Sequence, residues 1–269
     1  VIHTRHEQGA AFMAMGYAQA SGETGVFAVV PGPGLLNSLT ALATAASANL
    51  PVLGLTGQIP SYQIGQNYGM AHELKDQRAV SRGIVDWVAR AEHPSQVPAL
   101  LADAFAAMHS GRKSPAVFEM APDQLGARAP VEPLPPVPPQ PAPEPDAELV
   151  GEAAERLSKA ARPLILVGGG IVDAEAPLLA VAEQLGAPVV MSPNARGTIS
   201  DAHPLAFEML GGQELWQAAD VALVVGTRFT TTALAWGRED EVETIRIDID
   251  PTQIVKPRRA GIEIVSSAE

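Results

Sequence analysis

Short apolar runs alternate with longer stretches of helical periodicity from one end of the chain to the other. Runs of about five residues rich in Val, Ile and Leu are typical of strands buried in a parallel sheet, with crossover helices between them. The pattern therefore predicts an α/β protein. We expect strands at Val1–Thr4, Val26–Val30, Pro51–Thr56, Ala116–Met120, Pro163–Val167, Pro188–Met191, Val221–Val225 and Thr244–Ile249, and a strand-like run in the terminal GIEIVSSAE. We expect helices at Glu7–Ala20, Leu35–Asn49, Ser95–His109, Glu148–Ala161 and Glu175–Leu185.

The periodic pattern stops after residue 125, and nine of the sixteen residues from Pro130 to Pro145 are proline. Proline lacks a backbone N–H and favours an extended polyproline path, so we expect a semi-rigid linker here. The chain is predicted to hold two domains, residues 1–125 and 147–269, joined by a linker at 126–146. Both ends resemble cuts through a longer protein, because each falls in a strand-like run.

Composition excludes several classes of protein. With 269 residues, 46% of them hydrophobic, the chain is long enough for one or two domains with substantial cores. The absence of cysteine excludes disulfides, Cys-ligated metals and thiol nucleophiles. A formal net charge of −12 without a run of Lys or Arg argues against nucleic acid and anionic membranes as partners. No apolar run approaches the roughly 18 residues of a spanning helix, and no signal peptide is evident, so we expect a cytoplasmic protein.

Four short features of the first domain follow predicted strands, where open α/β sheets bind ligands. They are RHEQGA around Glu7, PGPGLLN from residue 31 to 37, TGQIP from 56 to 60, and QNYGMAHE from 66 to 73. Each also has a purely structural interpretation. Glu7 could complement a helix dipole, the glycines around Pro33 could form a tight turn, and Asn37 and Gln58 could satisfy loop backbone.

Taken in order, RHEQGA, GPGxxN and TGQxP resemble the pyrimidine-binding domain of thiamine diphosphate enzymes, in the acetolactate synthase-like branch. The resemblance continues through PLILVGGG, DAHPL, VALVVGTRF and IRIDIDP and covers the whole chain. It implies two doubly wound parallel-sheet domains: a flavodoxin-like pyrimidine-binding domain, incomplete at its N-terminus, and a Rossmann-like central domain. The GDG element of the family's C-terminal domain, which holds magnesium and the cofactor's phosphates, does not occur in this sequence.

The resemblance also implies a chemistry, namely decarboxylation or carboligation of 2-oxo acids with thiamine diphosphate and Mg. Glu7 matches the family's catalytic carboxylate, which hydrogen-bonds the far pyrimidine nitrogen so that the cofactor's own amino group becomes the base. Pro33 and Asn37 match residues that line the pyrimidine site, and Gln58 lies on the same loop edge. The family's cofactor lies across two subunits, so we expect a homodimer or homotetramer, with this chain alone inactive.

A second feature favours assembly. The helix expected at Leu35–Asn49 is apolar or small on nearly every face, and such a helix needs partners all round. We expect it to pack on its copy about a two-fold axis, unless neighbouring helices of the same chain cover it.

One loop departs from the family. Acetolactate synthases continue from the TGQ loop to a Phe-Gln-Glu stretch that faces the substrate, whereas this chain has Tyr68, Met70 and His72 in that region. Pyruvate condensation is therefore not expected. His72 could be an acid–base group with an ordinary pKa of about 6.5, or a cap or surface residue. The other histidines have no metal-ligand spacing, and no metal site is predicted in this chain.

The central domain poses a separate cofactor question. Its glycine run from 168 to 170 lacks the last glycine of a dinucleotide fingerprint. In the resembled family this domain binds FAD, ADP or nothing, and the matching nucleotide-contacting positions are Gly168, Gly169, Gly226, Arg228 and Asp248. Asp248 could instead start the turn at Asp250, and threonines at 230–232 replace the family's Asp-Asp-Arg. Two rival functions therefore stay open: a non-catalytic adenine-nucleotide or FAD-binding module, and an electron-transfer flavoprotein.

Overall fold

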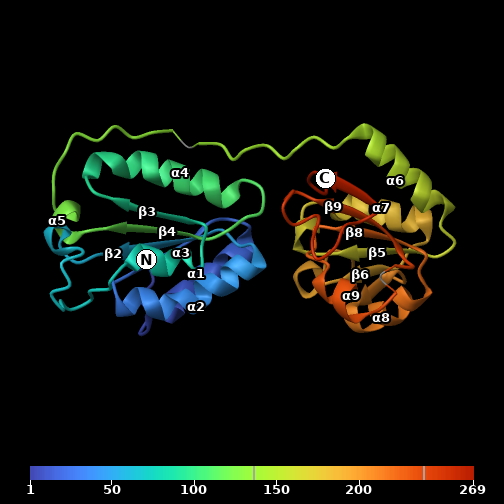
Figure 1. Cartoon of the computed structure of the whole chain (residues 1–269), viewed down its shortest axis with the longest axis horizontal. Coiled ribbons are helices and arrows are strands. Elements are labelled where there is room, and N and C mark those ends of the chain that lie inside the picture. Colours follow the sequence, from blue (N-terminus) through green and yellow to red (C-terminus); the bar gives the residue numbers. More distant parts are fainter. Residues whose placement is uncertain (136, 239) are drawn as a thin grey trace. The chain divides into compact units, whose positions relative to one another are not determined.

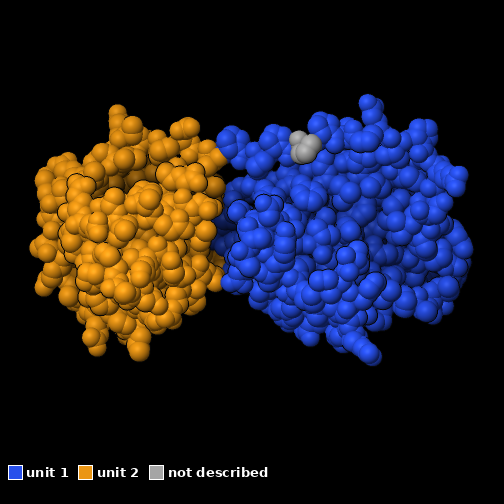
Figure 2. Space-filling model, turned by 180° about the vertical axis from the view of Figure 1, so that it is seen from behind, with its two compact units in different colours: residues 1–141 blue, residues 142–269 orange. Residues whose placement is uncertain are grey.

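The computed structural model describes residues 1–135, 137–238 and 240–269 and divides into two compact units, Val1–Pro141 and Ala142–Glu269 (Figure 1, Figure 2). Each unit contains one parallel sheet with helices on its faces, which confirms the predicted fold class. The predicted boundaries at residues 125 and 147 stay predictions, and Pro136 of the expected linker lies outside the described residues.

The sheet of the first unit has four parallel strands in the order β1-β2-β4-β3. Helix α4 covers one face, and α1 and α2 cover the other (Figure 1), so that two apolar clusters form on opposite sides of the sheet. The strands are β1 (Gly25–Val29), β2 (Val52–Gly57), β3 (Trp87–Ala91) and β4 (Ala116–Met120). The helices are α1 (Glu7–Ser21), α2 (Pro33–Ala48), α3 (Gln77–Arg82), α4 (Val97–His109) and α5 (Pro122–Leu125), with 3-10 turns η1 (Ser61–Gln63) and η2 (Pro94–Gln96).

Helices α1 and α2 lie against each other through small side chains. Ala14 and Ala18 of α1 are buried, as are Ala41 and Ala45 of α2, and alanines allow a close approach of two helices. The alternative left open for this helix, that a neighbouring helix of the same chain covers it, therefore holds for the face of α2 that packs on α1. An exposed face of α2 remains, and it includes Leu36.

The first unit differs from the prediction at two places, and strand pairing explains both. Residues 1–4 form no strand, because no neighbouring strand pairs with them. Strand β3 was not expected, since its residues include the charged Arg90. The register places Arg90 beside Glu119 of β4, and the two charges neutralise each other inside the sheet.

The sheet of the second unit has six parallel strands in the order β10-β9-β8-β5-β6-β7. The first strand of this unit, β5, lies at the centre, and the chain switches sides between β7 and β8, as in a Rossmann fold. The strands are β5 (Pro163–Val167), β6 (Val189–Met191), β7 (Ala206–Glu208), β8 (Val221–Val225), β9 (Glu243–Asp248) and β10 (Ile262–Val265). The helices are α6 (Ala147–Lys159), α7 (Glu175–Leu185), α8 (Met209–Ala218) and α9 (Thr230–Ala235), with 3-10 turns η3 (Gly169–Ile171) and η4 (Pro193–Ala195).

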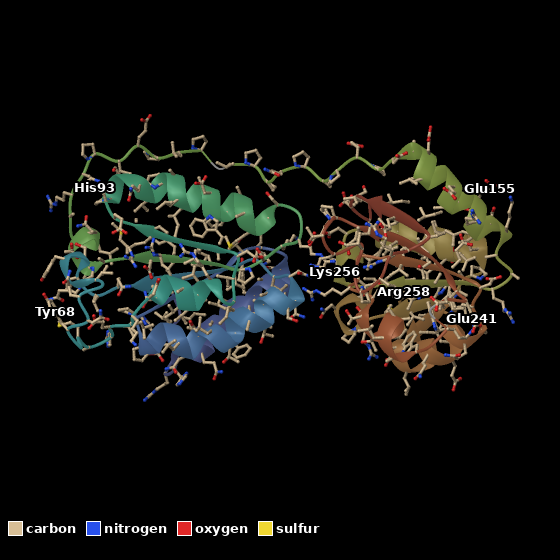
Figure 3. The ribbon with its side chains drawn as sticks, viewed as in Figure 1. Tyr68, His93, Glu155, Glu241, Lys256 and Arg258 are labelled. Carbon is tan, nitrogen blue, oxygen red and sulfur yellow. The ribbon has the colours of Figure 1, made fainter. Side chains whose placement is uncertain are left out.

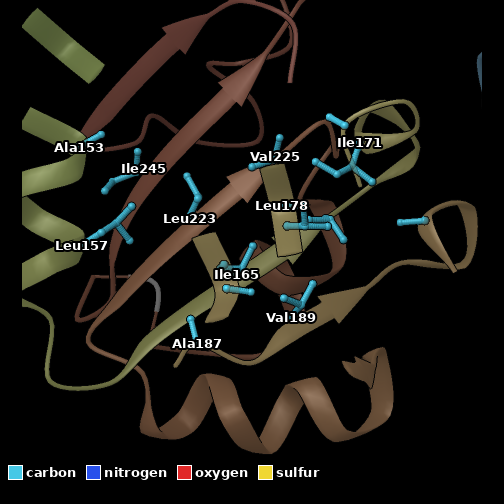
Figure 4. Packing of buried hydrophobic residues seen from close by; sticks show 14 of the residues in the cluster. Ala153, Leu157, Ile165, Ile171, Leu178, Ala187, Val189, Leu223, Val225 and Ile245 are labelled. Atoms are coloured by element: carbon cyan, nitrogen blue, oxygen red, sulfur yellow. The ribbon is translucent and has the colours of Figure 1, made fainter. Parts of the chain in front are cut away.

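Apolar side chains fill both faces of this sheet. On one face, Leu157 of α6 and Leu178 of α7 pack on Ile165, Val225 and Ile245 (Figure 4). On the other face, α8 and α9 pack around a buried tryptophan at position 216. Helix α7 and strand β8 begin and end as predicted, whereas β7, α8 and α9 were not expected. Within the described ranges, no helix combines the length and the apolar character needed to cross a bilayer.

Candidate functional site

Glu7 begins helix α1 and lies next to the first turn of α2. The Asn37 side-chain amide donates a hydrogen bond to Glu7 Oε2 over 3.1 Å. Gly34 lies beside this carboxyl, because a Cβ there would lie 3.5 Å from Glu7 Oε1; its close contact would be with Val30 Cγ2, at 2.6 Å. A hydrogen bond from its own backbone N–H and then the Asn37 amide hold the pKa of the Glu7 carboxyl below its ordinary value. Glu7 is therefore a carboxylate at neutral pH, with a proton-accepting oxygen on the side of Gly34.

The turn between β1 and α2 carries Gly32 and Pro33. Gly32 has φ +61°, and a Cβ there would lie 2.5 Å from the backbone oxygen of His72. Only glycine fits this contact. Pro33 is exposed at the start of α2. The turn is thus in backbone contact with the loop from residue 66 to 76.

That loop carries the three predicted substrate residues. Tyr68 lies at the edge of the first unit (Figure 3), with 66% of its surface exposed. The backbone N–H of Met70 donates to the Glu73 carboxylate over 2.8 Å, which fixes the loop locally. His72 is exposed, has φ +71° and touches Gly32 through its backbone. The structure therefore brings this loop to the turn, and the substrate roles of Tyr68, Met70 and His72 stay predictions.

Gln58 follows β2 and is buried. Its Oε1 accepts a hydrogen bond from the backbone N–H of Ile59 over 2.8 Å. This hydrogen bond matches the purely structural interpretation of Gln58, in which its side chain bonds to the backbone of the loop. A role of Gln58 at the pyrimidine site stays a prediction.

Gln77 is a buried residue of this site that sequence reasoning missed. Its Oε1 accepts from the Gly32 N–H over 2.9 Å, and its Nε2 donates to the Gly57 carbonyl and to Glu119 Oε2 over 3.0 and 2.7 Å. Glu119 is fully buried and pairs with Arg90 across 2.5 Å. The available signal was Glu119 itself, because an acidic residue inside an apolar strand requires buried donors.

In the second unit, the loops after β5 and β8 close on each other at the switch point. A Cβ at Gly168 would lie 2.3 Å from the carbonyl oxygen of Gly226, which has φ +57°. The backbone N–H of Gly168 donates to the Val225 carbonyl over 3.0 Å. Gly169 begins the 3-10 turn that follows β5. Three of the predicted nucleotide-contacting positions are therefore neighbours in space.

A cavity of about 210 Å³ lies at the same edge of this sheet. Its lining includes Arg228 and the three threonines at 230–232. Small-molecule sites usually span about 300–1,000 Å³, so this cavity suits a fragment of a nucleotide better than a whole dinucleotide. Asp248 is buried at the end of β9, and its Oδ1 accepts from the Asp250 N–H over 3.0 Å, as expected for a turn residue. No group of three His, Asp or Glu residues arranged for a metal occurs in the described part of the chain.

Two family models match most of the chain. Residues 1–80 match the family described as thiamine pyrophosphate enzyme, N-terminal TPP binding domain, and residues 150–269 match the thiamine pyrophosphate enzyme central domain. The chain belongs to the family of thiamine pyrophosphate enzymes, and it corresponds to the N-terminal and central domains of that family.

The relatives within this family have different activities. A probable 2-ketoarginine decarboxylase of Pseudomonas aeruginosa is 37% identical over 257 residues, which cover 93% of this chain and 46% of that protein. The large subunit of acetolactate synthase isozyme 1 of Escherichia coli is 31% identical over 279 residues, which cover 100% of this chain and 49% of that protein. The chain thus spans about half the length of these relatives.

A solved structure supports the fold alone. A thiamin diphosphate-dependent enzyme from Mycobacterium smegmatis superimposes with a TM-score of 0.79 over 98% of this chain and 53% of that one, at 23% sequence identity.

The residues present fit the aminopyrimidine part of thiamine diphosphate. A carboxylate with one oxygen held by the Asn37 amide keeps its other oxygen as an acceptor, which matches the need of a ring nitrogen that shares a proton. Glu7, Pro33 and Asn37 would hold that ring.

Proposed function

We propose that this chain is the pyrimidine-binding and central part of a thiamine diphosphate-dependent enzyme that decarboxylates or ligates 2-oxo acids. The observation that carries the proposal is the Glu7 carboxylate, held by Asn37 beside the Gly34 turn. Family membership supports the class of enzyme, and the relatives include a decarboxylase and a synthase. The Glu7 geometry supports the role of this residue.

When bound, thiamine diphosphate supplies a thiazolium carbon that attacks the oxo group and accepts electrons from the bond that breaks. Glu7 Oε1 would share a proton with the pyrimidine ring nitrogen, while Asn37 holds Oε2. Because its pKa is lowered, the free Glu7 carboxyl is ionised at neutral pH, so that proton would come from solvent when the cofactor binds. Pro33 and the turn behind it would hold the ring beside Glu7.

The whole enzyme needs more than this chain supplies. We propose that the diphosphate and Mg bind to a further domain, that the active form is a homodimer or homotetramer, and that residues 1–269 alone are inactive. The match to this chain covers only about half of each relative, which supports the presence of a further domain. FAD or ADP in the central domain and a cytoplasmic location stay predictions.

The loop from residue 66 to 76 supports a substrate other than pyruvate. It contacts the cofactor turn through His72, and it contains Tyr68 and Met70 where acetolactate synthases have their Phe-Gln-Glu stretch. We propose a 2-oxo acid with a longer side chain, and the first-named relative is a probable 2-ketoarginine decarboxylase. A panel of 2-oxo acids, with release of carbon dioxide as the readout, tests this choice.

The experiment that tests the function uses Glu7→Gln in the full-length protein. An amide cannot share the proton in the same way, so exchange of the cofactor's C2 proton is expected to fall at least a hundredfold, since acid–base groups typically contribute about 10²–10⁴. Glu23→Gln, an exposed acid just beyond α1, is the matched control and should exchange at the wild-type rate. Unchanged exchange in Glu7→Gln would overturn the assignment. Mass analysis of ligands extracted from the purified protein tests the two rivals, since either predicts an adenine nucleotide or flavin without thiamine diphosphate.

A further inference from the structure

We infer that Gln77 is a positioning residue for the cofactor turn, which it fixes to a buried ion pair on the far strands of the sheet. The inference rests on the proposed function, because the turn matters only if Glu7 and Pro33 receive a pyrimidine ring.

The first argument is the hydrogen bonding of Gln77 itself. Its side chain, 1% exposed, makes three hydrogen bonds to three separate segments: the turn at Gly32, the end of β2 at Gly57, and Glu119 of β4. A primary amide provides the acceptor and the two donors that this place needs. A carboxylate would lack the donors. An apolar side chain would leave the Gly32 N–H without its acceptor, while the Gly57 carbonyl would keep only the Thr56 hydroxyl and Glu119 only Arg90.

The second argument is the rigidity behind Gln77. Glu119 is fully buried, and the Arg90 guanidinium holds its other oxygen at 2.5 Å, with the Arg90 side chain 8% exposed. Arg90 in turn lies 3.6 Å from Glu92. Gln77 is therefore oriented by charges inside the sheet rather than by solvent.

The third argument is what lies in front of Gln77. Gln77 Oε1 accepts a hydrogen bond from the Gly32 N–H. Gly32 belongs to the turn that places Gly34 beside Glu7 and leads into the helix that carries Asn37. Gly32 also touches the backbone of His72, five residues before Gln77. A single side chain thus joins the cofactor turn to the core, so its loss moves the groups around Glu7 without removing any of them.

Helix α3 offers a matched control. Ser81 is also buried, one turn after Gln77, and its hydroxyl donates to the Gln77 backbone carbonyl over 3.1 Å rather than to the cofactor turn. Ser81→Ala removes a buried hydrogen bond from the same helix and leaves the contacts of the Gln77 side chain in place.

The test compares Gln77→Met, Ser81→Ala and wild type in the full-length protein, with calorimetric affinity for thiamine diphosphate and Mg as the main readout. Gln77→Met is expected to raise the dissociation constant at least tenfold, while Ser81→Ala stays within twofold. In the cofactor-free protein, hydrogen–deuterium exchange of residues 30–38 should accelerate at least tenfold in Gln77→Met only. At saturating cofactor, the substrate KM should change less than twofold, which separates positioning from general loosening.

The outcomes separate the two proposals. If wild type binds thiamine diphosphate, Glu7→Gln is inactive, and Gln77→Met matches Ser81→Ala in affinity and exchange, the positioning role is wrong and the proposed function stands. If wild type does not bind the cofactor, both are wrong. Should Gln77→Met not fold, Gln77→Glu keeps the acceptor for Gly32 but repels Glu119, and wild-type affinity in that variant overturns the inference.

Discussion

Removing the Arg90 guanidinium tests whether the buried ion pair holds the first unit together. Arg90→Met keeps an unbranched apolar stem and leaves the fully buried Glu119 carboxylate without its cation. Loss of one partner from a buried pair typically costs about 3–5 kcal/mol, because the remaining charge is neither hydrated nor compensated. The Gln77 amide still donates to Glu119 Oε2, so we expect the lower end, about 3 kcal/mol.

Calorimetry of the full-length protein measures this loss as a shift of the transition that contains the first unit. About 3 kcal/mol corresponds to roughly 6–12 °C for a unit of this size. Lys159→Met is the control, because it removes an exposed pair with Glu155 on α6 (Figure 3), and such pairs contribute little.

The double variant Arg90→Met/Glu119→Met sharpens the test. Replacing both charges by apolar groups is often close to neutral, so most of the lost stability should return. Two results would refute the reasoning: a single variant that melts within about 1 °C of wild type, or a double variant that is no more stable than the single one.

Three further predictions follow from other contacts. Hydrogen bonds from the Ser61 hydroxyl and N–H lower the pKa of the Asp123 carboxyl to about 2. The stability that these bonds contribute is therefore present above pH ~4 and lost as the pH falls towards 2. Acid unfolding followed by circular dichroism should be steeper in wild type than in Asp123→Asn. Gly168→Ala should destabilise the second unit by about 1–3 kcal/mol through overlap with the Gly226 carbonyl, whereas Gly151→Ala, at an open helix position, should raise its melting temperature slightly. Ala43→Arg on the exposed face of α2 should dissociate the full-length oligomer in sedimentation, and an intact oligomer would exclude this face from the interface.

The sequence by itself determined the fold class and most of the elements. Apolar runs such as Val221–Val225 are strands whichever neighbours they meet, because both of their faces must be buried. The three motifs around Glu7, Pro33 and Gln58 indicated the family for a similar reason, since glycines and polar groups after strands are local features that the chain shows directly.

Tertiary structure alone decided where charges could be buried and which turns meet. Strand β3 was invisible in the sequence because Arg90 interrupts it, and only the register with Glu119 makes that charge tolerable. Glu119 signalled that buried donors were needed, but the sequence did not show that Gln77 is one of them, since its three partners come from segments that are far apart in the chain. Local periodicity reports what one element buries, whereas pairing across elements depends on contacts that exist only after the sheet has formed.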